Sequence, residues 1–300
     1  MQPAVVLTGL TKQFGGVRGI TGVTIEVPAG GVFGFLGPNG AGKSTTIRLI
    51  MGLYRPTAGS ALVLGADPWD HGAEIRRRIG YLPGELALFP RLTGREIVDR
   101  FAAARRLVDL GYRDHLVHRL GAELDRPVKA LSKGNRQKIG LVLAFMHRPE
   151  LLVLDEPTSG LDPLLQDEFA ALVEESVAEG RTVFLSSHDL DEVQRLVHSL
   201  AIVREGRIVA VDTVEGLRSR APRRIELRFA GSVEPGAFAR LPGVDVVSAA
   251  AGRIVLSVRG SVGPVLAAAV PFEPVDITAR PADLDELFRS FYREEAVGAR

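Results

Sequence analysis

The sequence contains no cysteine, and it has one tryptophan and three methionines among its 300 residues. The absence of cysteine excludes disulfides, zinc–thiolate sites and thiol nucleophiles, and it fits a reducing compartment. No apolar run approaches the ~18 residues that a membrane-spanning helix needs. The first ten residues have neither the basic stretch nor the apolar core of a signal peptide. We therefore expect a chain that is soluble by itself.

The sequence also lacks an excess of charge of either sign. Lys and Arg number 37 against 36 Asp and Glu, which leaves a formal net charge of +1. A protein that recruits nucleic acid or anionic lipid through its overall field needs a surplus of basic residues. The charge balance therefore predicts no nucleic-acid partner.

The hydrophobic pattern predicts a large α/β domain. The apolar run at residues 32–36 predicts a strand that enters a glycine-rich turn and then a helix from Lys43, the unit that opens a parallel sheet. Residues 86–148 predict a mainly helical subdomain. Further strands are expected at residues 5–7, 25–27, 151–154, 182–185, 201–203 and 208–210, and apolar spacing predicts a helix over residues 190–200.

A basic stretch at residues 218–224 predicts a boundary, so we expect one domain at residues 1–220 and a second at 221–300. The second domain is predicted to be a small, ferredoxin-like α+β sandwich with the order β-α-β-β-α-β. Its expected strands cover residues 225–229, 244–247, 254–258 and 275–278, and its expected helices cover residues 265–269 and 283–292. The role of this domain is open between stabilising the fold and strengthening or regulating dimer contact.

A phosphate-binding loop follows the strand at residues 32–36. The segment fits G-x-x-x-x-G-K-[ST] between a strand and a helix, the context that this motif requires. Glycines let successive N–H groups turn inward around an anion, Lys43 reaches the β- and γ-phosphates, and the Ser44 hydroxyl is a ligand for Mg²⁺. The predicted loop consists of Gly37, Pro38, Asn39, Gly40, Ala41, Gly42, Lys43, Ser44 and Thr45.

Two adjacent carboxylates, Asp155 and Glu156, end the apolar strand at residues 151–154. Side chains alternate along a strand, so the two cannot share one task. Asp155 is predicted to hold Mg²⁺ through coordinated water. Glu156 is predicted to be the catalytic base that polarises the attacking water. An acidic turn without function is the alternative for this pair when it is taken alone.

The segment Leu131-Ser132-Lys133-Gly134-Asn135 lies about twenty residues before Asp155. Together with the phosphate loop and the acidic pair, it resembles the signature of ABC transporter ATP-binding subunits, which usually reads L-S-G-G-Q. Lys133 stands where the family has glycine and Asn135 where it has glutamine, whereas Ser132 and Gly134 are kept. The resemblance implies a RecA-like core with a mixed sheet and a helical subdomain. It also implies that Ser132 and Gly134 open a helix aimed at the γ-phosphate of ATP held by a second copy.

Further residues take roles from the same resemblance. Asp162, after Ser159-Gly160-Leu161, is similar to the D-loop aspartate that crosses the dimer interface. His188 resembles the switch histidine that hydrogen-bonds the γ-phosphate and assists catalysis, although a lone histidine at a strand end is usually structural. Phe14 resembles the aromatic residue that stacks on adenine, and it could equally cover the core.

One position departs from the family pattern in a way that affects the metal. Gly84 stands where the family's Q-loop has glutamine, and glycine has no side-chain oxygen for Mg²⁺. Either Glu85 supplies an oxygen to the metal, or water fills the position.

The resemblance implies an ATPase with ATP and Mg²⁺ as cofactors. Two copies pair head to tail around two ATP molecules and drive a separately encoded permease from the cytoplasmic side of the membrane. The segment 282–292 resembles the end of drug and antibiotic exporter subunits, which favours export. Two alternatives are a non-transport ABC ATPase of ribosomes or DNA repair and a nucleotide-switched regulator. The single phosphate loop, and the absence of room for a coiled coil before Leu131, count against the first.

Overall fold

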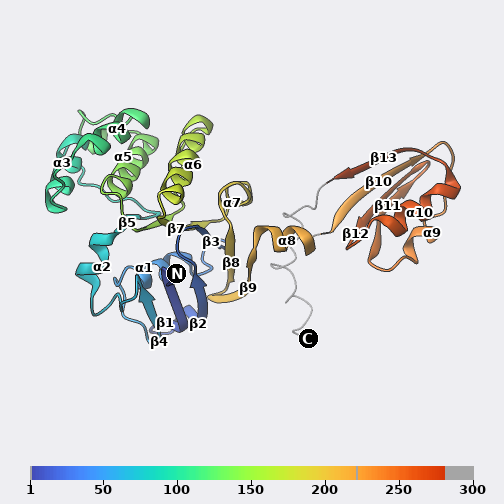
Figure 1. Ribbon diagram of the computed structural model, residues 1–300, viewed down its shortest axis with the longest axis horizontal. Coiled ribbons are helices and arrows are strands. Elements are labelled where there is room, and N and C mark those ends of the chain that lie inside the picture. Colours follow the sequence, from blue (N-terminus) through green and yellow to red (C-terminus); the bar gives the residue numbers. More distant parts are fainter. Residues whose placement is uncertain (1, 221, 281–300) are drawn as a thin grey trace. The chain divides into compact units, whose positions relative to one another are not determined.

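The computed structural model describes residues 2–220 and 222–280, and these form two compact units (Figure 1). The first unit ends at Val211 and the second begins at Asp212. The predicted boundary after residue 220 placed residues 214–220 in the first domain. In the structure these residues form the helix α8 (Val214–Arg220), which belongs to the second unit. Within the described residues, no helix combines the length and apolar character needed to cross a membrane.

A six-stranded sheet forms the centre of the first unit, in the order β5-β6-β7-β3-β8-β9. The neighbouring strands from β5 to β8 run parallel. Every residue of β3, β6 and β7 is buried, as expected for parallel strands covered on both faces. The strands are β3 (Val32–Leu36), β5 (Ile79–Leu82), β6 (Leu151–Asp155), β7 (Thr182–Ser187), β8 (Ser199–Arg204) and β9 (Arg207–Thr213).

A second, antiparallel sheet packs on the same core in the order β2-β1-β4. It consists of β1 (Val5–Phe14), β2 (Val17–Val27) and β4 (Ala58–Val63). The helix α1 (Lys43–Ile50) contacts β2 and β4 of this sheet and β6 of the central sheet, with Ile47 and Ile50 fully buried. Burial against both sheets fixes the N-terminus of α1, and therefore the phosphate loop before it.

The helices α3, α4 and α5 group together in the first unit, away from β1, β2 and β4 (Figure 1). A capping box between Thr93 and Glu96 starts α3, and Ser132 caps α5. The helices of this unit are α1, α2 (Gly72–Arg78), α3 (Gly94–Ala104), α4 (Gly111–Arg119), α5 (Lys133–Phe145), α6 (Pro163–Ala178) and α7 (Leu190–Leu196), with a 3₁₀ turn at Val128–Ala130.

The helix expected over residues 190–200 is shorter than predicted. It ends at Leu196, its C-cap Val197 is extended, and β8 begins at Ser199. Leu200 continues the apolar spacing of the helix, but in the structure it pairs with Gly34 of β3 in the parallel register. Pairing with a buried central strand therefore overrides the helical period at this point.

The second unit contains a four-stranded antiparallel sheet in the order β11-β12-β10-β13. Its core combines inward residues of β10 and β12 with Phe238 and Val265 from two short helices. The predicted helix at residues 283–292 lies outside the described residues. The elements are β10 (Arg223–Phe229), α9 (Gly236–Ala239), β11 (Val244–Ala250), β12 (Arg253–Val258), α10 (Gly263–Ala269), a 3₁₀ turn at Val270–Phe272 and β13 (Pro274–Arg280).

Candidate functional site

The phosphate loop connects the end of β3 to the start of α1. Gly42 takes the N-cap position of α1 with φ of +107°, and as a glycine it has no side chain to cap the first-turn N–H groups. An uncapped helix N-terminus presents N–H donors and a positive dipole to an anion. The left-handed backbone of Gly42 suits glycine, and a Cβ there would lie 2.7 Å from Ile20.

Gly37 provides a test of how tightly this loop is held. A Cβ at this position would lie 2.3 Å from the carbonyl oxygen of Val203 in β8, so backbone would have to move. We expect Gly37→Ala to lower the free energy of unfolding by about 1–3 kcal/mol, as overpacking does, and to weaken ATP binding. Chemical denaturation measures the first effect. Gly16→Ala is the control, because no atom lies within 4 Å of its Cβ position. Equal stability of the two variants would contradict the close approach.

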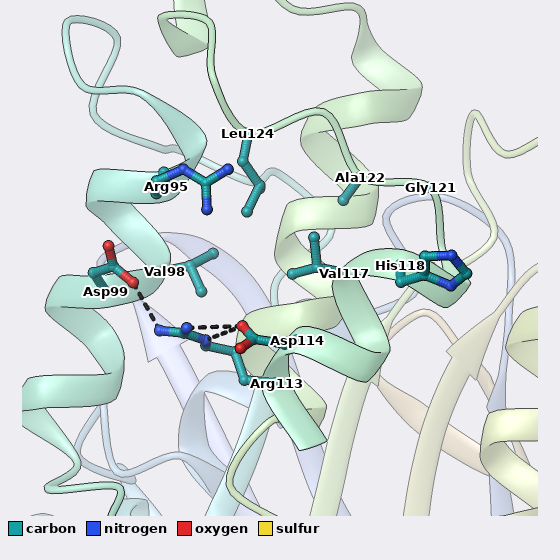
Figure 2. Close-up of a pocket in the computed structure, with 10 residues that line it drawn as sticks. All are labelled: Arg95, Val98, Asp99, Arg113, Asp114, Val117, His118, Gly121, Ala122 and Leu124. Carbon is teal, nitrogen blue, oxygen red and sulfur yellow. Dashed lines mark hydrogen bonds and ion pairs between the residues drawn. The ribbon is translucent and has the colours of Figure 1, made fainter. Parts of the chain in front are cut away.

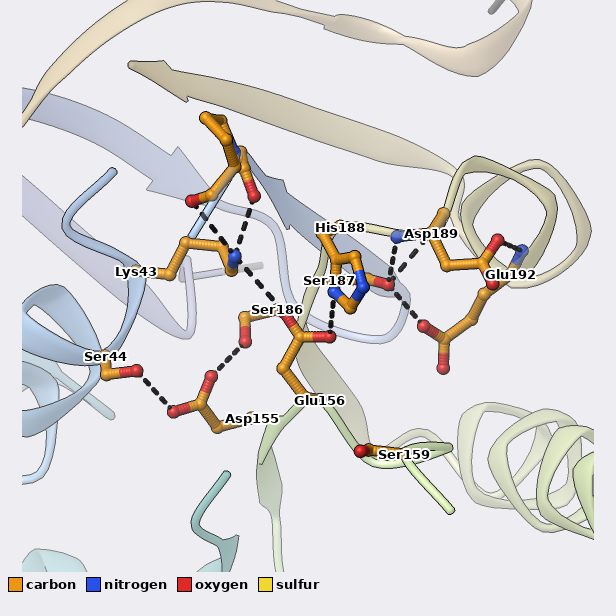
Figure 3. Close-up of polar contacts among 12 residues, drawn as sticks. Lys43, Ser44, Asp155, Glu156, Ser159, Ser186, Ser187, His188, Asp189 and Glu192 are labelled. Atoms are coloured by element: carbon orange, nitrogen blue, oxygen red, sulfur yellow. Dashed lines mark hydrogen bonds and ion pairs between the residues drawn. The ribbon is translucent and has the colours of Figure 1, made fainter. Parts of the chain in front are cut away.

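Lys43 is almost completely buried, with 6% of its surface exposed. Its Nζ donates to the carbonyl oxygen of Gly37 at 2.7 Å and lies 3.1 Å from Oε1 of Glu156 (Figure 3). A buried ammonium group is stable only with such partners. The loop carbonyl and Glu156 therefore hold the charge of Lys43 beside the N-terminus of α1.

Asp155 and Ser44 form a group of oxygen donors on the other side of the loop. The Ser44 hydroxyl donates to Oδ2 of Asp155 at 2.8 Å, and the Ser186 hydroxyl donates to Oδ1 (Figure 3). Ser186 pairs with Asp155 in the parallel register of β6 and β7, so both lie where the strands end. Asp155 is only 3% exposed, and its charge is stabilised by these two hydroxyls.

Glu156 and His188 face each other above the ends of β6 and β7. Nδ1 of the His188 imidazole lies 2.6 Å from Oε2 of Glu156, so the Glu156 carboxylate bridges Lys43 and His188 (Figure 3). Glu156 has φ of +52°, a left-handed conformation that is strained for any residue with a Cβ. Strained backbone conformations are common at functional sites. Here the left-handed conformation directs the Glu156 carboxylate away from Asp155.

These groups line one depression with a volume of ≈ 530 Å³. The structure brings together there Phe14, most of the phosphate loop, Glu85, Asp155, Glu156 and His188, all predicted from the sequence. Gly19, Arg48, Tyr81 and Ser159 also line it and were not predicted as site residues, although Ser159 belongs to the D-loop segment that precedes Asp162. Burial and the Asp155 carboxylate raise the pKa of Tyr81 to about 12, so its phenol stays neutral and can donate a hydrogen bond.

Phe14 lies at the rim of the depression and is 39% exposed. Its ring meets the edge of Tyr54 at 5.3 Å, and the Lys12 ammonium lies 5.3 Å from the Phe14 ring centroid. A partly exposed ring held by a neighbouring aromatic residue is suited to stack on a planar base. The core-covering alternative is disfavoured because the ring remains exposed.

Comparison with known proteins identifies the group to which the chain belongs. The family model for ABC transporters matches residues 20–159. The bacitracin transport ATP-binding protein BcrA of Bacillus licheniformis is 35% identical over 233 residues, which cover 76% of this chain and 76% of that protein. The chain belongs to the ABC transporter family. As a member of the ATP-binding part of this family, it binds ATP and is an ATPase.

Two further relatives agree with this membership. The daunorubicin/doxorubicin resistance ATP-binding protein DrrA of Streptomyces peucetius is 37% identical over 228 residues, covering 72% of this chain and 67% of that protein. A solved ATP-binding subunit of an ABC transporter superposes with a TM-score of 0.66 at 32% identity. That comparison covers 72% of this chain and 92% of the solved one.

The predicted ABC signature residues lie away from the depression. Ser132 accepts the N–H of Asn135 at 3.1 Å and caps α5, and Asp162 accepts the N–H of Leu165 at 3.0 Å and caps α6. Ser132, Gly134 and Asp162 are all missing from the lining of the depression. Each of these three residues is thus placed at or near a helix start rather than beside this copy's own phosphate loop.

The two departures within the signature have local partners. Asn135 exchanges two hydrogen bonds with the backbone of Glu123, at 2.7 and 2.8 Å, and it is 9% exposed. Lys133 donates to the Ser159 hydroxyl at 3.0 Å, and its stem passes Gly160. Both substitutions therefore brace the start of α5 against neighbouring segments.

The residues at the Q-loop position lie against the predicted metal ligands. A Cβ at Gly84 would lie 3.2 Å from Oδ2 of Asp155, so the backbone approaches this carboxylate closely. The described residues contain no group of three or more Asp, Glu, His or Cys side chains able to hold a metal by themselves. A metal at this place would rest on Asp155, Ser44 and the nucleotide's phosphate oxygens, which is how Mg²⁺ is usually bound beside phosphates.

A second depression of ≈ 440 Å³ lies between α3 and α4 (Figure 2). Its cationic side chains are occupied, since Arg113 lies 2.7 Å from both Asp99 and Asp114 and Arg95 pairs with Asp125 at 2.8 Å. Charges that neutralise each other leave little field for an anionic ligand. The charged residues of this depression therefore stabilise the packing of α3 and α4, and the depression is poorly suited to bind a nucleotide.

Proposed function

We propose that this chain is the ATP-hydrolysing subunit of an export complex and works at the cytoplasmic side of a membrane with a separately encoded permease. The relatives named for bacitracin transport and for daunorubicin/doxorubicin resistance support drugs or antibiotics as the cargo class. No helix of the described residues has the length and apolar character to cross a membrane, which supports a separate permease as the path for the cargo. Such a path would belong to another chain.

The observation that carries the proposal is that Ser132 and Gly134 lie outside the depression that contains the phosphate loop. The depression would enclose a nucleotide from the side of the phosphate loop only, and a complete site would need the Ser132 end of α5 from elsewhere. The first turn of α5 holds no acidic residue, so its N-terminus offers an anion positive dipole and donors. A second copy placed head to tail would bring its Ser132 and Gly134 to the γ-phosphate and its Asp162 to the interface.

The site residues then divide the work. The N–H groups of the phosphate loop hold the phosphates. Lys43 leaves its ion pair with Glu156 and binds the negatively charged phosphates. Ser44 and Asp155, with Glu85 or water at the Gly84 position, would hold Mg²⁺, which would supply positive charge beside the β- and γ-phosphates. Glu156, released from Lys43, accepts a proton from the attacking water. His188 remains beside Glu156 and hydrogen-bonds the γ-phosphate.

ATP-dependent pairing tests this proposal. We expect the purified chain to double in mass when given Mg²⁺ and a non-hydrolysable ATP analogue, because the nucleotide joins two half-sites. Light scattering after gel filtration measures the mass. The same chain without nucleotide is the control. If the mass remains that of a single chain at analogue concentrations that saturate binding, the proposal that two copies share the ATP site is wrong.

The permease partner is tested separately. In membranes prepared from cells that produce the tagged chain, we expect part of it to remain bound and to co-purify in mild detergent with an integral membrane protein. A chain found wholly in the soluble fraction would contradict the export complex while leaving the ATPase assignment intact.

A further inference from the structure

Near the catalytic pair lies Glu192, a half-buried residue with a buried carboxyl oxygen, which the proposed mechanism does not use. Glu192 stands in the first turn of α7, four residues after His188. Its Oε2 accepts from the Ser187 hydroxyl at 2.5 Å (Figure 3). Its Oε1 is buried and makes no close hydrogen bond among the described residues, although the Thr158 hydroxyl interacts with the carboxyl group and lowers its pKa. A half-satisfied buried carboxylate destabilises a fold, so this one needs a reason.

The contact partner of Glu192 closes the turn that carries His188. Ser187 ends β7 and immediately precedes His188. The hydroxyl oxygen of Ser187 accepts the N–H of Asp189 at 3.0 Å and lies 3.4 Å from the Asp189 carbonyl oxygen (Figure 3). His188 is therefore held between two residues joined through one hydroxyl group. Its imidazole leaves this turn toward Glu156, 2.6 Å away.

We propose that Glu192 is a positioning residue for ATP hydrolysis: it holds the Ser187 hydroxyl and thereby sets the turn that presents His188 to Glu156. The inference rests on the roles proposed above for Glu156 and His188. Glu192 itself is absent from the lining of the depression, so it acts through the turn and not on the nucleotide.

The electrostatic surroundings favour a protonated Glu192. Burial and, to a smaller extent, the carboxylates of Glu156 and Asp189 raise its pKa to about 7, against the lowering effect of the Ser187 and Thr158 hydroxyls. Asp189 caps α7 from the same turn, and Glu156 comes from the end of β6. Arg195, the basic residue of the last turn of α7, pairs with Asp167 of α6 at 2.6 Å.

The protonated form closes the turn more completely. An ionised Glu192 only accepts, so the single hydrogen of the Ser187 hydroxyl points to it. A protonated Glu192 donates to Ser187, which frees the Ser187 hydrogen to turn toward the Asp189 carbonyl oxygen. The Ser187 hydroxyl then joins both backbone groups of Asp189. Glutamine at position 192 can donate in the same way and imitates the protonated form.

Three variants test the positioning role in the full-length chain. We expect Glu192→Ala to lower kcat for ATP by about 10–100-fold, the scale of a misplaced catalytic group, while KM changes less than about threefold. Glu192→Gln should retain most of the activity and lose the decline in kcat above pH 7 that deprotonation causes in the parent chain. Asp191→Asn, an exposed carboxylate of the same helical turn, is the charge-matched control and should behave as the parent.

The outcomes separate this inference from the proposed function. Unchanged kcat in Glu192→Ala, in a parent chain that hydrolyses ATP, would overturn the positioning role. If Glu192→Gln loses as much activity as Glu192→Ala, the claim that protonated Glu192 is the active form is wrong. Ser187→Ala should cost as much as Glu192→Ala, and the double variant no more, because both changes break one contact. If the losses of kcat in the two single variants add up in the double variant, Glu192 and Ser187 do not act through one shared contact.

A measurement without nucleotide tests the buried carboxyl group even if the parent chain is inactive. A carboxyl group whose pKa rises on folding makes the folded chain lose stability as pH rises, here from about 4.5 to about 7. Glu192→Gln removes this loss. We expect it to raise the melting temperature by about 5 °C at pH 8 and by much less at pH 5, relative to the parent. Equal shifts at both pH values would contradict a Glu192 that is buried and protonated.

Discussion

Replacing Glu156 with glutamine should lower the rate of ATP hydrolysis by about 10²–10⁴-fold and leave ATP bound. The amide has nearly the same shape as the carboxylate but cannot accept the proton of the attacking water. It also removes the ion pair with Lys43 at 3.1 Å, so the phosphates meet less competition for the ammonium group. Phosphate release measures turnover, and a fluorescent ATP analogue measures affinity.

The same variant should accumulate as an ATP-bound pair of chains, because hydrolysis is what separates the two copies. Glu174→Gln, an exposed carboxylate on α6, is the matched control and should hydrolyse ATP at the parent rate. A Glu156→Gln chain that turns over ATP like the parent would remove Glu156 from the role of catalytic base. The phosphate loop and the fold would remain unaffected by that result.

Replacing Ser132 with aspartate should abolish ATP-dependent pairing while the monomer stays folded. Aspartate caps a helix as well as serine does, so α5 keeps the bond from the Asn135 N–H. Its negative charge would face the γ-phosphate bound by the other copy, and like charges at such range in a closed site cost several kcal/mol. Gel filtration with the non-hydrolysable analogue should therefore show a single chain, with nucleotide still bound.

Asparagine at the same position separates charge from shape. Ser132→Asn also caps α5 but is neutral, so it should lose far less pairing than Ser132→Asp. Mixing Ser132→Asp with Lys43→Ala should restore part of the ATPase activity, since one of the two shared sites would then contain both parent residues. No recovery from two folded, individually inactive chains would indicate that each copy works with its own Ser132.

Local patterns in the sequence were sufficient to predict the parts of the site that depend on backbone conformation. The strand at residues 32–36, the loop and the helix from Lys43 appear with these bounds because glycine placement and apolar runs act over short distances. The predicted division of labour between Asp155 and Glu156 remains a proposal. The structure does place the two carboxylates with different partners, as alternation along a strand suggested.

Other features could not be predicted because they depend on neighbours distant in the chain. Leu200 fits the helical spacing before it, yet pairing with β3 makes it part of a strand. Arg48 and Tyr81 line the depression only because α1 and the end of β5 meet there. Glu192 looks like an ordinary acidic residue in the first turn of a helix, and only its burial beside Ser187 gives it a further role.

By itself, the sequence determined that this chain has an ATP-binding loop, an acidic strand end and a capped signature helix, because each is a short segment whose conformation its own residues set. Only the tertiary structure decided which of these groups meet. Ser44 and Asp155 are 111 residues apart, Glu156 and His188 are 32 apart, and the packing of parallel strands brings each pair within hydrogen-bond distance. The same packing leaves Ser132 outside its own site, since α5 starts from the helical subdomain and not from the ends of the central strands.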